Sequence, residues 1–180
     1  EALCASNEID AVWIETPNHL HAEHAICAAQ SGKHVICAKP LAATLDECDK
    51  MIAACRANKV RLLIGHSKIF DPPIRAIGEI ARSGRHGKVI QIDSWLYNDW
   101  LRRPRLKEEL DEEKGAGFIL RQAPHLVDIA NYIAASPAQK LRAMSGQWEP
   151  SMPSDGNCAA LINYRSGAIA SMSLNGYGYF

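Results

Sequence analysis

His34-Val35-Ile36-Cys37-Ala38-Lys39-Pro40 reads as an apolar β-strand that ends in a lysine followed by a proline. In an open α/β sheet the carboxyl ends of the strands line the ligand crevice, so a residue leaving a strand there faces whatever is bound. Proline fixes its own φ at about −65° and pushes the preceding residue toward extended geometry, which gives Lys39 a defined position. We therefore predict a catalytic role for Lys39; the alternative is an ordinary surface lysine at a strand end.

The segments around this strand alternate between strands and helices. Apolar runs at Ala11–Ile14 and Val60–Gly65 predict two further strands. We expect a helix over His21–Gln30, closed by Gly32, and another after Thr44, where apolar residues recur at three- and four-residue spacing. Strands separated by helices imply parallel pairing through right-handed crossovers, as in a nucleotide-binding sheet.

The pattern changes after residue 66. We expect a helix over residues 72–83, a long strand over 88–97 and a second helix over 118–134. An antiparallel hairpin is expected over residues 157–174. The sequence therefore predicts an α/β chain in two parts. Residues 1–66 form a parallel part with the pattern of a nucleotide-binding sheet, and residues 67–180 form an α+β part with a largely antiparallel sheet.

The composition limits the partners that the chain can recruit. The 20 basic residues balance 20 acidic ones, so no overall charge favours nucleic acid or an anionic membrane, and anion recognition must be local. No apolar run approaches the roughly 18–20 residues of a membrane span, and no signal-peptide pattern is present. The six cysteines include no Cys-x-x-Cys pair, so we expect reduced thiols and a cytoplasmic protein.

Three segments that suit nucleotide chemistry follow one another along the chain: Thr16-Pro17-Asn18-His19-Leu20-His21, Gly32–Pro40, and Gly115-Ala116-Gly117 followed by His125-Leu126-Val127-Asp128. In this order they resemble the Gfo/Idh/MocA family of NAD(P)-dependent oxidoreductases. The resemblance implies that residues 1–66 are the C-terminal part of a Rossmann dinucleotide-binding domain and that residues 67–180 are a partial α+β substrate and oligomerisation domain with an open-faced sheet. It also implies NAD or NADP as cofactor, a small-molecule substrate, and a homo-oligomer, dimer or tetramer. It also implies that the glycine-rich cofactor fingerprint precedes Glu1, so we expect a piece of a longer protein in which the choice between NAD and NADP cannot be read.

The same resemblance assigns the cofactor contacts. They are Thr16, Pro17, His21, Lys39 and Pro40. The family's usual glutamate before the lysine is Ala38 here, which removes one polar contact to the cofactor. His19, His21 and His24 could suggest zinc, but no cysteine or carboxylate completes a recognisable ligand spacing, so we predict no metal site.

The resemblance also implies the catalytic groups. His125 is the candidate base, because imidazole titrates near neutrality, and Lys39 would stabilise the developing alkoxide or pass on its proton. Asp128 lies three residues along the same helical face and is expected to help orient or bind the substrate. The alternative for His125 is a histidine satisfied within the core.

One departure from the family bears on the substrate. Sugar and inositol dehydrogenases of the family carry an aspartate four residues before the catalytic histidine, where this chain has Arg121. A guanidinium can hold a carboxylate by two parallel bonds, so Arg121, with Arg103 or Arg105, predicts an anionic substrate. Alternatively, these arginines pair with nearby acids or are simply solvated. The combination resembles the branch containing phthalate 4,5-cis-dihydrodiol dehydrogenases, which implies oxidation of a carboxylated cyclic cis-diol.

Two other functions stay open. A sugar or inositol dehydrogenase would keep Lys39 and His125 but would need Arg121 to bind a neutral hydroxyl. A non-catalytic sensor would bind the dinucleotide without turnover. We also expect Trp13 and Trp95 to be core aromatics rather than stacking surfaces.

Overall fold

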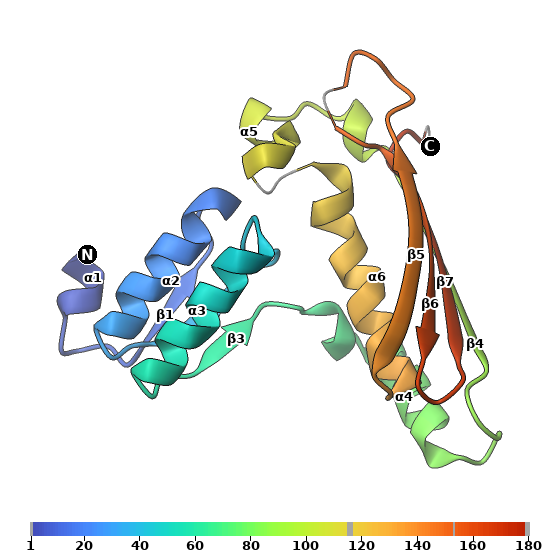
Figure 1. Cartoon of the computed structure of the whole chain (residues 1–180), viewed down its shortest axis with the longest axis horizontal. Coiled ribbons are helices and arrows are strands. Elements are labelled where there is room, and N and C mark those ends of the chain that lie inside the picture. Colours follow the sequence, from blue (N-terminus) through green and yellow to red (C-terminus); the bar gives the residue numbers. More distant parts are fainter. Residues whose placement is uncertain (1, 115–116, 153, 179–180) are drawn as a thin grey trace. The chain divides into compact units, whose positions relative to one another are not determined.

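The computed structural model describes residues 2–114, 117–152 and 154–178, which fold as two compact units (Figure 1). The first unit is Glu1–Gly65 with Asp111–Ala116, and the second is His66–Leu110 with Gly117–Phe180. The first unit contains α1 (Ala2–Ala5), β1 (Ala11–Ile14), η1 (Asn18–Leu20), α2 (His21–Gln30), β2 (His34–Cys37), α3 (Leu45–Ala57), β3 (Leu62–Ile64) and η4 (Glu112–Lys114).

The first unit is a three-stranded parallel sheet in the order β1-β2-β3. Its core joins Val12, Ile14, Val35 and Cys37 of the strands to α2 and α3, and α2 contributes alanines that are fully buried. The alternation of parallel strands and helices predicted from the sequence is confirmed. The third strand is shorter than predicted and spans only Leu62–Ile64.

Local sequence signals set the helix ends in this unit. Thr44 and Glu47 form a capping box at the start of α3: the Thr44 hydroxyl accepts the Glu47 backbone N–H at 3.2 Å, and the Glu47 carboxylate accepts the Thr44 N–H at 3.0 Å. After α2, Gly32 adopts a φ of 72°, a conformation that favours glycine, and lets the chain turn into β2.

The prediction that Trp13 is a core aromatic was wrong. Its side chain is 66% exposed, and Leu63 of β3 is 60% exposed. Side chains alternate between the two faces of a strand, and β1 directs Val12 and Ile14 toward the helices. Trp13 therefore lies on the opposite face, where the described residues of this unit place no covering helix.

All six cysteines are free thiols. Burial raises the pKa of the Cys37 thiol to about 11, and it raises the pKa of Cys55 and Cys158 as well. Thiols that stay protonated behave as small apolar residues, which agrees with their positions in or beside the two cores.

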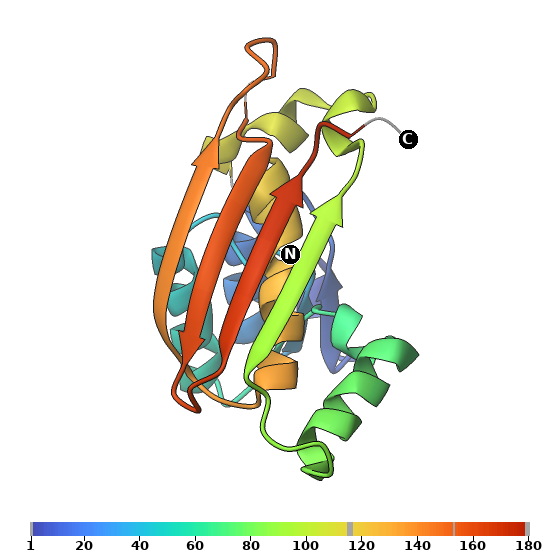
Figure 2. The same cartoon turned by 90° about the vertical axis from the view of Figure 1, so that its right-hand side faces the viewer.

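The second unit pairs a four-stranded sheet with a long helix. Its elements are η2 (Lys68–Phe70), α4 (Pro72–Ser83), β4 (Gln91–Tyr97), η3 (Trp100–Arg102), α5 (Lys107–Leu110), α6 (Phe118–Ala134), β5 (Ala138–Gly146), β6 (Asn157–Tyr164) and β7 (Ile169–Asn175). Figure 2 shows the strands side by side in the order β4-β7-β6-β5, with α6 behind them. β5, β6 and β7 pair antiparallel, and β4 pairs parallel to β7, so the predicted open, largely antiparallel sheet is confirmed.

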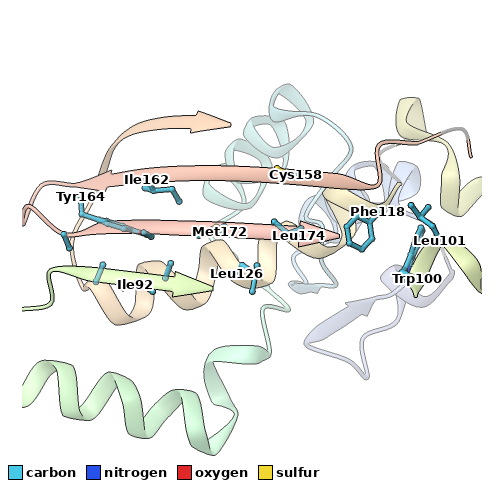
Figure 3. Packing of buried hydrophobic residues seen from close by; sticks show 14 residues of the cluster. Ile92, Trp100, Leu101, Phe118, Leu126, Cys158, Ile162, Tyr164, Met172 and Leu174 are labelled. Carbon is cyan, nitrogen blue, oxygen red and sulfur yellow. The ribbon is translucent and has the colours of Figure 1, made fainter. Parts of the chain in front are cut away.

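The core of this unit lies between α6 and one face of the sheet (Figure 3). Phe118, Leu126 and Ala130 of α6 pack against alternate residues of β4, β6 and β7, among them Ile162 and Leu174. The other face of the sheet is exposed. It carries Trp95, which is 66% exposed and is therefore a second aromatic whose predicted core position was wrong.

No helix within the described ranges 2–114, 117–152 and 154–178 is long and apolar enough to cross a membrane.

Candidate active site

Lys39 lies where the sequence predicts, directly after β2 at the carboxyl edge of the parallel sheet. The Ala38 backbone N–H donates to the carbonyl of Ile14 at 2.9 Å, and the Gly65 N–H donates to the carbonyl of Cys37 at 2.7 Å. A Cβ atom on Gly65 would come within 3.3 Å of the Cys37 oxygen, so glycine permits this close approach. The three strand ends are thereby bonded together just before the half-buried Lys39 side chain.

Two turns at this edge are linked through histidine side chains. Thr16 Oγ1 lies 3.1 Å from Nδ1 of His24. The His21 ring is only 1% exposed, with Nδ1 2.9 Å from the Pro40 carbonyl oxygen and Nε2 2.8 Å from the Thr16 carbonyl oxygen. Both His21 nitrogens thus face the chain's own carbonyls, which leaves the ring no ready polar contact to a cofactor. Pro40 is buried, whereas Thr16 is half-buried and Pro17 is exposed.

Helix α6 carries the other predicted catalytic groups. It begins after Gly117, whose φ is 87°, while Gly115 and Ala116 of the predicted glycine-rich segment lie outside the described residues. His125 and Asp128 are half-buried, three residues apart, and therefore lie on one side of the helix. Nδ1 of His125 is enclosed by protein.

His66 is a candidate site residue that the sequence reasoning missed. Its Nδ1 atom lies 3.5 Å from Oδ1 of Asp128, and both side chains are 23% exposed. They line a pocket of about 350 Å³ whose remaining wall is largely apolar and includes Leu120 and Val127 of α6. One signal could have found it: His66 follows the third predicted strand much as Lys39 follows the second. An imidazole beside a carboxylate has a defined ring orientation, as acid–base chemistry requires.

Arg105 and Arg121 converge on one carboxylate. Oε1 of Glu109 lies 3.6 Å from Arg105 and 3.7 Å from Arg121, while Oε2 accepts the Leu106 backbone N–H at 3.1 Å. The Arg105 guanidinium also stacks 4.2 Å from the centre of the Trp100 ring and donates to the Trp100 carbonyl. Arg105 and Arg121 therefore both pair with a nearby acid, which is the alternative given for them above, and the pairing brings two guanidinium groups to one carboxylate.

Arg103 does not join this group. Its Nε donates to Asp99 at 2.8 Å and its side chain is 65% exposed. The hydrogen bond from the guanidinium holds the pKa of the Asp99 carboxyl below its ordinary value. For Arg103 the structure therefore matches the alternative of pairing with a nearby acid.

Among the described residues, no three histidine, cysteine or acidic side chains lie close enough together to hold a metal ion. The polar groups at the candidate site are imidazole, ammonium, guanidinium and carboxylate groups.

Comparison with known proteins assigns both parts of the chain. Residues 1–66 match the family model described as an oxidoreductase family with an NAD-binding Rossmann fold, and residues 74–178 match the GFO/IDH/MocA C-terminal domain. The 1-carboxy-3-chloro-3,4-dihydroxycyclo hexa-1,5-diene dehydrogenase of Comamonas testosteroni is 37% identical over 100% of this chain and 45% of its own length. The levoglucosan dehydrogenase of Pseudarthrobacter phenanthrenivorans is 31% identical over 89% of this chain and 42% of its own length.

A solved structure from Bordetella bronchiseptica RB50 superposes with a TM-score of 0.89 at 40% identity and covers 95% of this chain and 45% of that one. The chain thus spans less than half the length of these relatives. The family models together account for the parallel unit with Lys39 and for the sheet unit with α6. The chain belongs to the Gfo/Idh/MocA family of NAD-binding oxidoreductases.

Proposed function

We propose that this protein is an NAD(P)-dependent dehydrogenase that takes a hydride from a carboxylated cyclic cis-diol. The proposal is carried by Arg121, which lies one turn before His125 on α6. Arg105 contacts the same Glu109 carboxylate as Arg121, so two guanidinium groups lie on and beside the helix that bears His125. A planar guanidinium pair suits a carboxylate better than a neutral sugar hydroxyl. The name of the Comamonas relative describes a ring that carries one carboxyl and two hydroxyl groups, which supports the same substrate class.

The carboxyl edge of the parallel sheet in the first unit suits binding of a nicotinamide cofactor. Dinucleotides bind at the carboxyl ends of parallel strands, where the turns at Thr16 and Lys39 lie. When bound, the cofactor supplies the hydride acceptor. This chain's residues position the turns, hold the substrate and move its proton.

In the proposed reaction the substrate's C–H bond breaks as hydride leaves the carbinol carbon, and its O–H bond breaks as His125 takes the proton. Lys39 stabilises the oxygen while the negative charge develops. A carbonyl forms, and loss of a further ring proton to oxygen gives the dihydroxy aromatic. Aromatisation makes the hydride loss favourable. Asp128 orients His66 within the α6 pocket.

Arg121→Ala is expected to raise KM for carboxylated diols roughly 10- to 100-fold, because a hydrogen bond to a charged group contributes about 1.5–3 kcal/mol. Turnover should change much less. Initial rates measured with an acidic diol and with its uncharged amide separate the effects: the amide should show little change. The exposed Arg85 provides the matched control, as Arg85→Ala. Equal losses for acid and amide would contradict carboxylate binding.

The sugar or inositol dehydrogenase is the second candidate function, and the Pseudarthrobacter relative acts, by its name, on levoglucosan. The test is absorbance of reduced nicotinamide, using the full-length protein with NAD or NADP and a panel of carboxylated cis-diols and polyols. Signal with the acids alone supports the proposal. Signal with polyols alone keeps the family and rejects the substrate, and cofactor binding without any signal favours the sensor.

We propose a cytoplasmic setting as well. The six free cysteines, several of them buried, support a reducing compartment.

We also propose that the exposed face of the sheet binds a second copy of the chain. One row across this face runs from Asp93 on β4 through Ser171 and Leu161 to Arg142 on β5. The row ends are about 14 Å apart, three strand spacings, and carry opposite charge. A two-fold axis parallel to the strands would place Asp93 of each copy over Arg142 of the other. Exposed Trp95, Met144 and Leu161 would then become buried.

Leu161→Glu is expected to convert the full-length oligomer to monomers, because it buries an unpaired charge in the proposed interface. Arg142→Asp should weaken association, and adding Asp93→Arg should restore it by exchanging the charges. Analytical ultracentrifugation gives the oligomeric state of Leu161→Glu, of Arg142→Asp and of the charge-exchanged double variant. Leu45→Glu is the control, since Leu45 is 83% exposed on α3. An unchanged oligomer in Leu161→Glu would rule out this face.

A further inference from the structure

The His21 ring bridges two backbone turns from a buried position. It belongs to the first turn of α2, its side chain is 1% exposed, and its nitrogens face the carbonyl oxygens of Thr16 and Pro40 at 2.8 and 2.9 Å. Thr16 follows β1, and Pro40 follows Lys39 after β2. The ring therefore joins the ends of two neighbouring parallel strands at the edge that bears Lys39.

The chemistry of the two contacts is specific. A carbonyl oxygen only accepts, so each contact is a hydrogen bond only when that ring nitrogen carries a hydrogen. A neutral imidazole donates from one nitrogen, and its tautomer decides which of the two carbonyls accepts, whereas the imidazolium donates to both. A hydrogen bond of this kind in a buried position holds the backbone of the turn that accepts it, and the ring packs directly against the other.

We propose that His21 is a positioning residue for Lys39. By holding the Pro40 carbonyl, it fixes the peptide segment from which the Lys39 side chain extends, and by holding the Thr16 carbonyl it ties that segment to the neighbouring strand. This inference rests on the proposed catalytic role of Lys39. It replaces the cofactor contact predicted for His21 from the sequence with an action through the lysine.

A double-mutant cycle in the full-length protein tests the action through Lys39. His21→Gln keeps one amide donor and should lower kcat on the order of 10-fold, with a smaller change in KM. In a Lys39→Ala background the same substitution should change kcat less than about 2-fold, because the group that it positions is gone. Equal factors in both backgrounds would overturn the inference. His19→Gln, at an exposed position in the preceding turn, is the matched control.

Two NMR measurements decide the question without catalysis. In the wild-type protein labelled with 15N-histidine, His21 should show a slowly exchanging ring N–H signal, as a hydrogen bond from the buried ring requires; a ring with no protected N–H would overturn the bridge even if no His21 variant folds. In protein with 13C-methylated lysines, the Lys39 signal, assigned by its loss in Lys39→Ala, should shift in His21→Gln and not in His19→Gln. A Lys39 signal that does not shift would reject positioning. Full activity of Lys39→Ala would instead reject the proposed function, so the two failures are distinguishable.

Discussion

Replacing His125 with glutamine is expected to lower kcat of the full-length protein on the order of 10²- to 10⁴-fold, the usual contribution of a positioned general base. His125 lies half-buried on α6, one turn after Arg121 and three residues before Asp128. Glutamine keeps a polar side chain but cannot accept the hydroxyl proton at neutral pH. KM for the diol should change little, because binding is assigned to the arginines. Steady-state rates with saturating cofactor and varied diol give kcat and KM separately.

The matched control for this prediction is His86→Gln, since His86 is exposed in the loop between α4 and β4. Its rate should equal that of the unmodified protein. If His125→Gln kept full turnover while raising KM, His125 would be a binding residue. The roles of His125 and Arg121 would then be reversed.

Lys39→Met is expected to lower kcat on the order of 10²- to 10³-fold. Loss of one group that stabilises developing negative charge usually lowers the rate by this factor. Methionine preserves most of the aliphatic length but carries no charge. The bonded strand ends around Cys37 and Gly65 should hold the backbone in place, so the melting temperature should change little. The reduced-nicotinamide absorbance assay gives the rate, and circular dichroism gives the melting temperature.

Lys50→Met is the corresponding control, because Lys50 is exposed on α3. A large loss of melting temperature in Lys39→Met, proportional to the loss of rate, would show that the lysine serves the fold. Full turnover in Lys39→Met would remove it from the mechanism.

Local sequence patterns predicted most of the architecture. The helices at 21–30, 72–83 and 118–134 begin and end where caps, prolines and apolar spacing place them, and three strands pair in parallel. β5 was not predicted, because an edge strand whose side chains are almost all exposed carries no alternation of apolar and polar residues. β4 begins three residues later than predicted, at Gln91.

Tertiary placement explains the remaining differences in the site. Trp13 and Trp95 are aromatic residues in strands, and only the position of the covering helices decides which face is buried. The contact between Arg121 of α6 and Glu109 of α5 joins separate helices, so no sequence spacing reveals it, whereas Arg105 lies four residues before Glu109. Similarly, the His66–Asp128 pair spans 62 positions, and the turn that buries His21 depends on Pro40 in another segment.

The central claim is hydride transfer from a carboxylated cis-diol. The most direct measurement uses the full-length protein, its oxidised cofactor and a diol deuterated at both carbinol carbons, followed by mass spectrometry of the cofactor. We predict one deuterium in the reduced nicotinamide ring together with a dihydroxy aromatic acid. Bound cofactor that stays oxidised and unlabelled with every acidic diol would contradict the claim.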